Sequence, residues 1–71
     1  MAESVYKVIE LVGTSNDSWE KAAAAAIDRA SQTLRDLRVA RVTEQDIHIE
    51  AGKALIYRVK MEISFKYEGG S

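Results

Sequence analysis

The sequence predicts an α+β domain with the element order β-α-β-β, in which one helix packs on a three-stranded antiparallel sheet. Three segments rich in β-branched and aliphatic residues, 5–12, 39–49 and 55–67, are typical of strands. Between the first two, apolar residues recur with helical spacing from residue 19 to residue 37. A length of 71 residues allows one domain, residues 1–71, and we expect an ordered core of about 4–68.

Composition and charge argue against several classes of protein. Hydrophobic residues make up 46% and charged residues 30%, which is globular composition. Ten Lys and Arg against eleven Asp and Glu give a net charge of −1, which disfavours a nucleic-acid surface. No apolar run approaches the roughly 20 residues that cross a bilayer, and the opening residues 1–4 lack a signal-peptide pattern. Because cysteine is also absent, we expect a cytoplasmic protein without disulfides and without membrane or nucleic-acid partners.

The predicted helix follows a break at residues 13–16, where we expect the first strand to end. Asp17 with Glu20 three residues later has the form of a helix start, in which Asp17 would be the N-cap. Trp19 lies on the apolar stripe of this helix, so we expect it to pack in the core or between subunits. The run Ala22–Ala26 has little volume and lets the helix lie close to a sheet.

The turn at residues 51–53 makes the last two strands antiparallel. We expect the last strand in the middle of the sheet, because every neighbour is then antiparallel and the helix connection crosses over normally. Residues 69–71 are expected to form a loose tail. Symmetric pairing about the turn predicts two oppositely charged pairs across the strands: Asp46 with Arg58, and Glu44 with Lys60.

The middle strand changes phase, with apolar residues at even positions in its first half and at odd positions in its second. A one-residue β-bulge between about Thr43 and Asp46 explains the change. Such a bulge turns Val39 and Arg41 away from the helix, onto the face that carries Arg58.

No pattern typical of catalysis is present: there is no cysteine, no evident Ser-His-acid set and no glycine-rich phosphate loop. We therefore predict no catalytic residues and no enzyme. The segment 13–15, ahead of the helix, is interpreted as an ordinary strand-to-helix turn rather than an anion site. His48, the only histidine, is interpreted as a surface or interface residue.

Acidic residues at alternate positions of the middle strand form a candidate metal site: Glu44, Asp46 and Glu50. Neighbours on one strand face lie about 7 Å apart, near enough for two carboxylates to converge on one hard cation. Calcium prefers six to eight oxygen ligands, so symmetry-related copies would have to complete the shell. From the residues alone we favour the alternative, cross-strand ion pairing with Arg58 and Lys60.

Several segments together resemble the dodecin family. They are VYKV at 5–8, LVGTS at 11–15, AIDRA at 26–30, Val42 with Glu44-Gln45, and the strand 57–65. The resemblance implies a hollow homododecamer in which each protomer's sheet wraps its helix, with a non-enzymatic role in storing or sequestering flavins. Assembly would also stabilise a domain whose own core is small.

The resemblance also identifies candidate ligand-binding residues: Val39, Arg41, Gln45 and Arg58. Dodecins stack flavins between tryptophans across a two-fold axis and bond the ring edge through a glutamine on the last strand. Here Val39 stands at the position of the tryptophan and Arg58 at that of the glutamine, so the chain is a variant without the stacking tryptophan. Valine has no π face, and we expect weakened flavin binding.

Three functions stay open on the sequence. The first is a store for a flavin of the FMN, FAD or riboflavin class, with weakened stacking. The second is a shell that binds Ca²⁺ through Glu44, Asp46 and Glu50, since dodecins also hold ions at symmetry axes. The third is a structural assembly without a native ligand.

Overall fold

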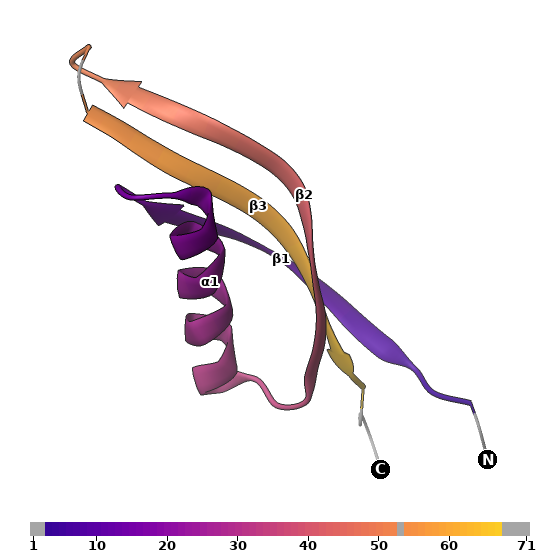
Figure 1. The fold of residues 1–71 in the computed structure, drawn as a ribbon. Helices are drawn as coiled ribbons and strands as arrows, with labels where there is room; N and C mark the ends of the chain where they lie inside the picture. Colours follow the sequence, from indigo (N-terminus) through magenta and orange to yellow (C-terminus); the bar gives the residue numbers. More distant parts are fainter. Residues whose placement is uncertain (1–2, 53, 68–71) are drawn as a thin grey trace.

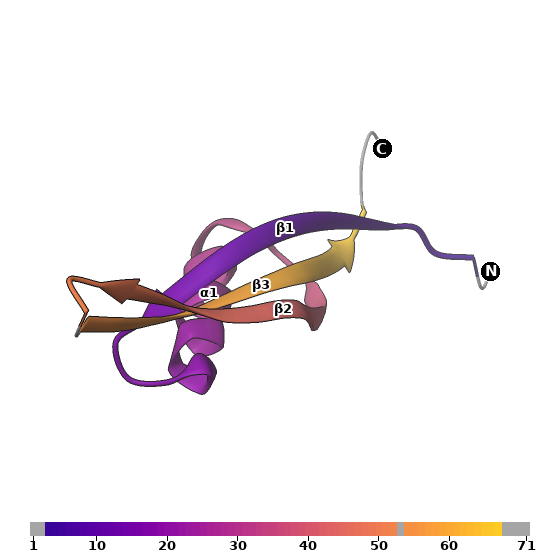
Figure 2. The same ribbon diagram turned by 90° about the horizontal axis from the view of Figure 1, so that it is seen from above.

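The computed structural model describes residues 3–52 and 54–67 and confirms the predicted α+β architecture. The elements are β1 (Tyr6–Ser15), α1 (Trp19–Thr33), β2 (Leu37–Glu50) and β3 (Ala54–Lys66). β3 lies between β1 and β2 and is antiparallel to both, as predicted. The sheet curves around α1, so the molecule has two layers (Figures 1 and 2). The predicted tail at 69–71 and turn residue 53 lie outside the described residues.

β1 does not end at residue 13 as predicted but continues through Ser15. The extra residues find partners along the long strand β3, where Gly13 pairs with Val59 and Ser15 with Tyr57. Gly13 interrupts the apolar pattern of β1 because the backbone of α1 packs directly against it. A Cβ at this position would overlap the backbone carbonyl oxygen of Ala22 in α1.

The helix N-cap is Ser18, so the prediction of Asp17 was wrong. Ser18 has an extended backbone, and its Oγ accepts a hydrogen bond from the backbone N–H of Lys21 at 3.0 Å. Asp17 lies one residue too early for this bond and instead pairs with the Lys21 ammonium at 3.2 Å.

α1 ends at Thr33, four residues before the end of the apolar stripe. Leu34 is already extended, and Asp36 adopts a left-handed conformation with φ of 59°. This turn redirects the chain so that Leu37, predicted on the helical stripe, begins β2.

The buried core is formed by six residues: Ala22, Ala26 and Ala30 of α1, and Val59, Met61 and Ile63 of β3. Trp19 packs against this cluster, as predicted. Ala26 and Ala30 of the predicted stripe are buried, which confirms that face of the helix, whereas Ala22 is buried without having been predicted and Ala23 is only partly buried. Ile27 is 38% exposed at the margin of the sheet.

The β2–β3 hairpin is about twice as long as α1. Fifteen helical residues span about 22 Å, whereas fourteen strand residues span about 46 Å. The hairpin therefore extends beyond the first turn of the helix (Figure 1). Its apolar residues Ile47, Ile49 and Leu55 stay exposed in the single chain.

Among the described residues, no helix has both the length and the hydrophobicity that a membrane span needs.

The predicted β-bulge is present. The register of β2 against β3 shifts between Val42 and Glu44, so Thr43 is the extra residue. The Thr43 hydroxyl donates a hydrogen bond to the backbone carbonyl of Lys60 at 3.1 Å. A second register shift, between Leu37 and Val39, had no signal in the apolar pattern.

Candidate functional site

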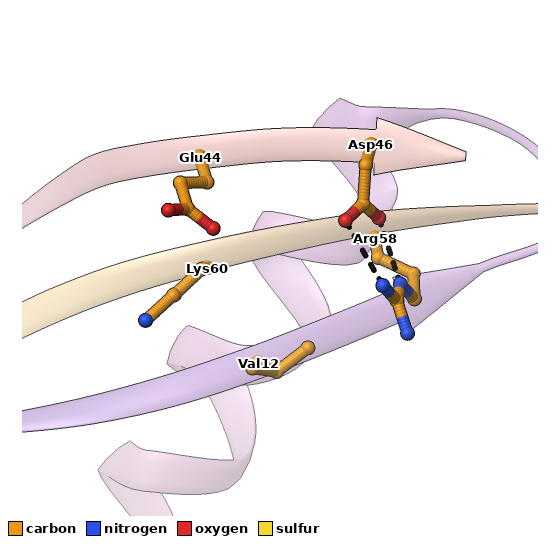
Figure 3. Close-up of a pocket in the computed structure, with 5 residues that line it drawn as sticks. All are labelled: Val12, Glu44, Asp46, Arg58 and Lys60. Atoms are coloured by element: carbon orange, nitrogen blue, oxygen red, sulfur yellow. Dashed lines mark hydrogen bonds and ion pairs between the residues drawn. The ribbon is translucent and has the colours of Figure 1, made fainter. Parts of the chain in front are cut away.

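The sheet face turned away from α1, here called the outer face, carries the predicted metal ligands and their basic neighbours. Glu44 and Asp46 of β2 line a shallow pocket of about 140 Å³ with Arg58 and Lys60 of β3 and Val12 of β1 (Figure 3). The pairing register places these side chains together. Asp46 lies opposite Arg58 and Glu44 opposite Lys60, which confirms the predicted register.

Asp46 and Arg58 form a bidentate ion pair (Figure 3). Arg58 Nε donates to Asp46 Oδ1 at 2.7 Å, and Arg58 Nη2 donates to Oδ2 at 2.9 Å. These hydrogen bonds hold the pKa of the Asp46 carboxyl below its ordinary value and raise the pKa of the Arg58 guanidinium. Because the carboxyl pKa is lowered, any stabilisation from the pair is present at neutral pH. It is lost as the pH falls through that lowered pKa.

The second predicted ion pair does not form. Lys60 faces Glu44 in register, but its Nζ lies 4.0 Å from Oε1 of Glu10 on β1. Across residues 3–52 and 54–67, no basic group lies within 4.0 Å of the Glu44 carboxylate. Glu10 is a neighbour that the hairpin alone could not reveal, because it belongs to the other pairing of β3.

Glu50 lies apart from the other two candidate metal ligands. It is six residues beyond Glu44 on an extended strand, which corresponds to about 20 Å. Its carboxylate Oε2 lies 3.3 Å from Nε2 of His48. Within the part of the chain that the structure describes, no three acidic or histidine side chains converge on one point. Glu44, Asp46 and Glu50 therefore do not come together at one point within a single protomer.

Three of the four predicted ligand-binding residues lie on the outer face: Val39, Arg41 and Arg58. The bulge in β2 puts Val39 and Arg41 on the face that carries Arg58, as the sequence predicted. Val39 lies opposite Ser64, six residues along β3 from Arg58, so about 20 Å of strand separates the two. Arg41 donates to Glu62 at 3.0 Å. In one chain these residues do not enclose a common cavity.

Gln45 lies on the opposite face of the sheet, toward α1. It pairs with buried Val59 and lines a hollow of about 180 Å³ beside Trp19 and Val42. A site that contains all four predicted residues would therefore need both faces of the sheet.

Trp19 makes a contact with the site that sequence reasoning missed. Its indole Nε1 donates to the backbone carbonyl of Asp46 at 3.1 Å, and its ring meets Tyr57 edge-on with centroids 5.3 Å apart. The two residues of the hydrogen bond are 27 positions apart. The contact depends on how far α1 reaches along β2, for which no local signal exists.

The dodecin family model matches residues 5–68. The chain belongs to the dodecin family. It is 54% identical over 63 residues to calcium dodecin of Mycobacterium tuberculosis, covering 89% of each chain. It is 42% identical over 64 residues to dodecin of Thermus thermophilus, covering 90% of this chain and 93% of that protein.

Solved dodecin structures share the whole fold. The crystal structure of M. tuberculosis calcium dodecin, described as a calcium-chelating antigen with a novel calcium-binding site, superposes with a TM-score of 0.86 at 50% identity. The match covers 96% of this chain and 97% of that one. Dodecin from Streptomyces coelicolor superposes with a TM-score of 0.90 at 38% identity, covering 99% and 100% of the two chains.

Proposed function

We propose that this dodecin assembles as a homododecamer and binds Ca²⁺ without catalysing a reaction. Glu44 and Asp46 would each supply oxygen ligands, and other copies would complete the shell. One observation carries the proposal: two carboxylates share a pocket on the outer face of a chain that is 54% identical to a calcium dodecin. Glu50, which lies near the hairpin turn, would serve a separate ion or an interface between copies.

Exposed apolar side chains support the assembly. Val5, Val12, Val39 and Ile49 are each at least 60% exposed in the single chain. Exposed apolar surface of this kind is typical of a protein that packs against partners. A core of six residues, three of them alanine, also leaves a lone protomer with little hydrophobic stabilisation.

The chemistry of the pocket supports calcium over magnesium. Glu44 and Asp46 project from an exposed strand, and their side chains can adjust to the irregular oxygen shell that Ca²⁺ accepts. Mg²⁺ demands near-ideal octahedral geometry and keeps more of its water.

Native mass spectrometry of protein purified without added ligand is the direct test of assembly and cargo. We expect the mass of twelve chains with calcium-sized increments. Removing the metal with a chelator should lower the Tm of the assembly by on the order of 10–20 °C. Free calcium at about 100 times its Kd stabilises the folded state by about 2.7 kcal/mol, and 1 kcal/mol shifts the Tm of a domain of this size by about 4–8 °C. The paired variant Glu44→Gln with Asp46→Asn should abolish the chelator effect.

Glu62→Gln is the matched control, because it removes a carboxylate from the same face outside the pocket. It should retain the chelator effect. An unchanged Tm in the wild-type protein would contradict the calcium proposal, and a monomer or dimer by mass would contradict the assembly.

Flavin binding is the second candidate, favoured by the family resemblance and by the outer-face position of Val39 and Arg58. We expect the wild-type assembly to bind riboflavin weakly. Val39→Trp should tighten binding by about 5–150-fold, since one aromatic stack contributes about 1–3 kcal/mol. Quenching of riboflavin fluorescence during titration measures the change.

Ile49→Trp is the control for this experiment, because it adds the same ring to an exposed position of β2 that is away from Val39 and off the outer face. It should leave riboflavin binding unchanged. Equal binding by both tryptophan variants would contradict a flavin site at Val39. Bare dodecamers that bind neither calcium nor riboflavin would favour the purely structural assembly.

A further inference from the structure

Both carboxylate oxygens of Asp46 already have a strong partner. Oδ1 accepts from Arg58 Nε and Oδ2 accepts from Arg58 Nη2, in the fork geometry that binds a carboxylate most specifically. Both side chains are about half exposed, so the pair can open to solvent without unpacking the core. Asp46 is therefore a carboxylate that is accessible but occupied.

The other carboxylate of the pocket is in a different state. Among the described residues, no basic side chain lies within 4.0 Å of the Glu44 carboxylate, because Lys60 reaches toward Glu10 instead. Figure 3 shows the Glu44 carboxylate turned into the same pocket as Asp46. A cation bound by Glu44 would therefore need Asp46, the second carboxylate of the pocket, as a further ligand, and Asp46 is paired with Arg58.

A calcium ion that binds through Asp46 competes with the Arg58 guanidinium for the same two oxygens. Calcium must coordinate at least one of them at about 2.3–2.6 Å, and that oxygen now accepts an N–H from Arg58. A calcium ion bound to Asp46 would also be repelled by the positive charge of the neighbouring Arg58 guanidinium. Calcium binding through Asp46 therefore weakens the bidentate pair with Arg58.

We propose that Arg58 competes with calcium for Asp46 and so sets the calcium concentration at which the pocket fills. This inference rests on the calcium function proposed above. The apparent affinity for calcium is the intrinsic affinity multiplied by the fraction of protein in which Asp46 is not paired with Arg58. At low calcium concentration the ion pair would keep the site empty, and Arg58 would neutralise the charge of the Asp46 carboxylate.

Calcium titration by isothermal calorimetry of the assembled protein tests the competition. Arg58→Gln should tighten calcium binding by about tenfold or more. Coulomb repulsion of a divalent ion by a guanidinium about 6 Å away in a water-like dielectric accounts for about tenfold by itself. Release of the competitor adds to that factor.

Arg41→Gln is the matched control. Arg41 lies on the same face and carries the same charge, but it pairs with Glu62 outside the pocket. A general effect of net charge would tighten binding equally in both variants. We expect Arg41→Gln to stay within about twofold of the wild-type protein, because Glu62 already compensates the charge of Arg41, and Arg58 rather than Arg41 holds Asp46.

The outcomes separate the two proposals. If the wild-type assembly binds no calcium, the proposed function fails. If it binds calcium and the two variants have equal affinity, the competition is overturned while the function stands.

Should Arg58→Gln fail to assemble, crystals of the wild-type protein with and without calcium decide the question. Calcium on Asp46 with the guanidinium displaced supports the proposal. A bidentate Arg58–Asp46 pair retained in the calcium-loaded crystal overturns it.

Discussion

Replacing Gly13 with alanine is expected to destabilise the folded assembly by about 3 kcal/mol, at the upper end of the range for overpacking. The new Cβ would overlap the carbonyl oxygen of Ala22 and lie 3.0 Å from the Ala26 Cβ. The first contact is with backbone, so no rotamer change relieves it and α1 has to shift away from β1. Urea denaturation at fixed protein concentration measures the loss, because unfolding would be coupled to dissociation of the proposed assembly.

Gly52→Ala is the control for the effect of the methyl group. A Cβ there meets nothing within 4 Å, although φ of +72° disfavours alanine by about 1–2 kcal/mol. Ala26→Gly combined with Gly13→Ala should not restore stability, because it leaves the Ala22 backbone in place. Recovery in that double variant would show that the helix does not approach β1 through its backbone.

Met61→Ala is expected to cost about 3 kcal/mol and to lower the yield of assembled protein. Met61 is 1% exposed at the centre of β3 and faces a helix surface of alanines. Alanine side chains are too short to fill the space, so the substitution leaves a cavity as well as losing apolar burial. Thermal unfolding and native mass spectrometry together report the loss of stability and of assembly.

Ile63→Val provides a graded comparison at a neighbouring core position. It removes one methylene from a side chain that is also 1% exposed, and should cost about 0.5–1.5 kcal/mol. Equal losses of unfolding free energy from Ile63→Val and Met61→Ala would contradict the view that large side chains of β3 fill the core.

The cross-strand pairs and the β-bulge that arrange the outer face could both be predicted from the sequence. The position of the turn sets the partners of Asp46 and Glu44, because antiparallel pairing is symmetric about a hairpin. The change of apolar phase in β2 revealed the bulge, because a half-buried strand must keep its apolar residues on one side. Both signals are local, so they needed no knowledge of the other elements.

Side-chain partners within that register depended on the whole sheet. Lys60 faces Glu44 across the hairpin, but β1 on the other side of β3 offers it Glu10. The register of β1 against β3 has no turn to define it, because a helix connects β1 to the rest of the sheet. Which lysine–carboxylate contact forms was therefore open until the third strand was placed.

Patterns in the sequence were enough to predict the order of elements, the strand order, the hairpin register and the face on which Val39, Arg41 and Arg58 lie. The strand order follows from the rule for crossover connections, and the other features follow from periodicity or from the turn, which act over neighbouring residues. Three other features became evident in the three-dimensional structure: β1 continues through Gly13, α1 stops at Thr33, and Trp19 donates to the Asp46 backbone. These features depend on how closely the helix approaches the sheet and how far it reaches along it, which are properties of packing between distant segments.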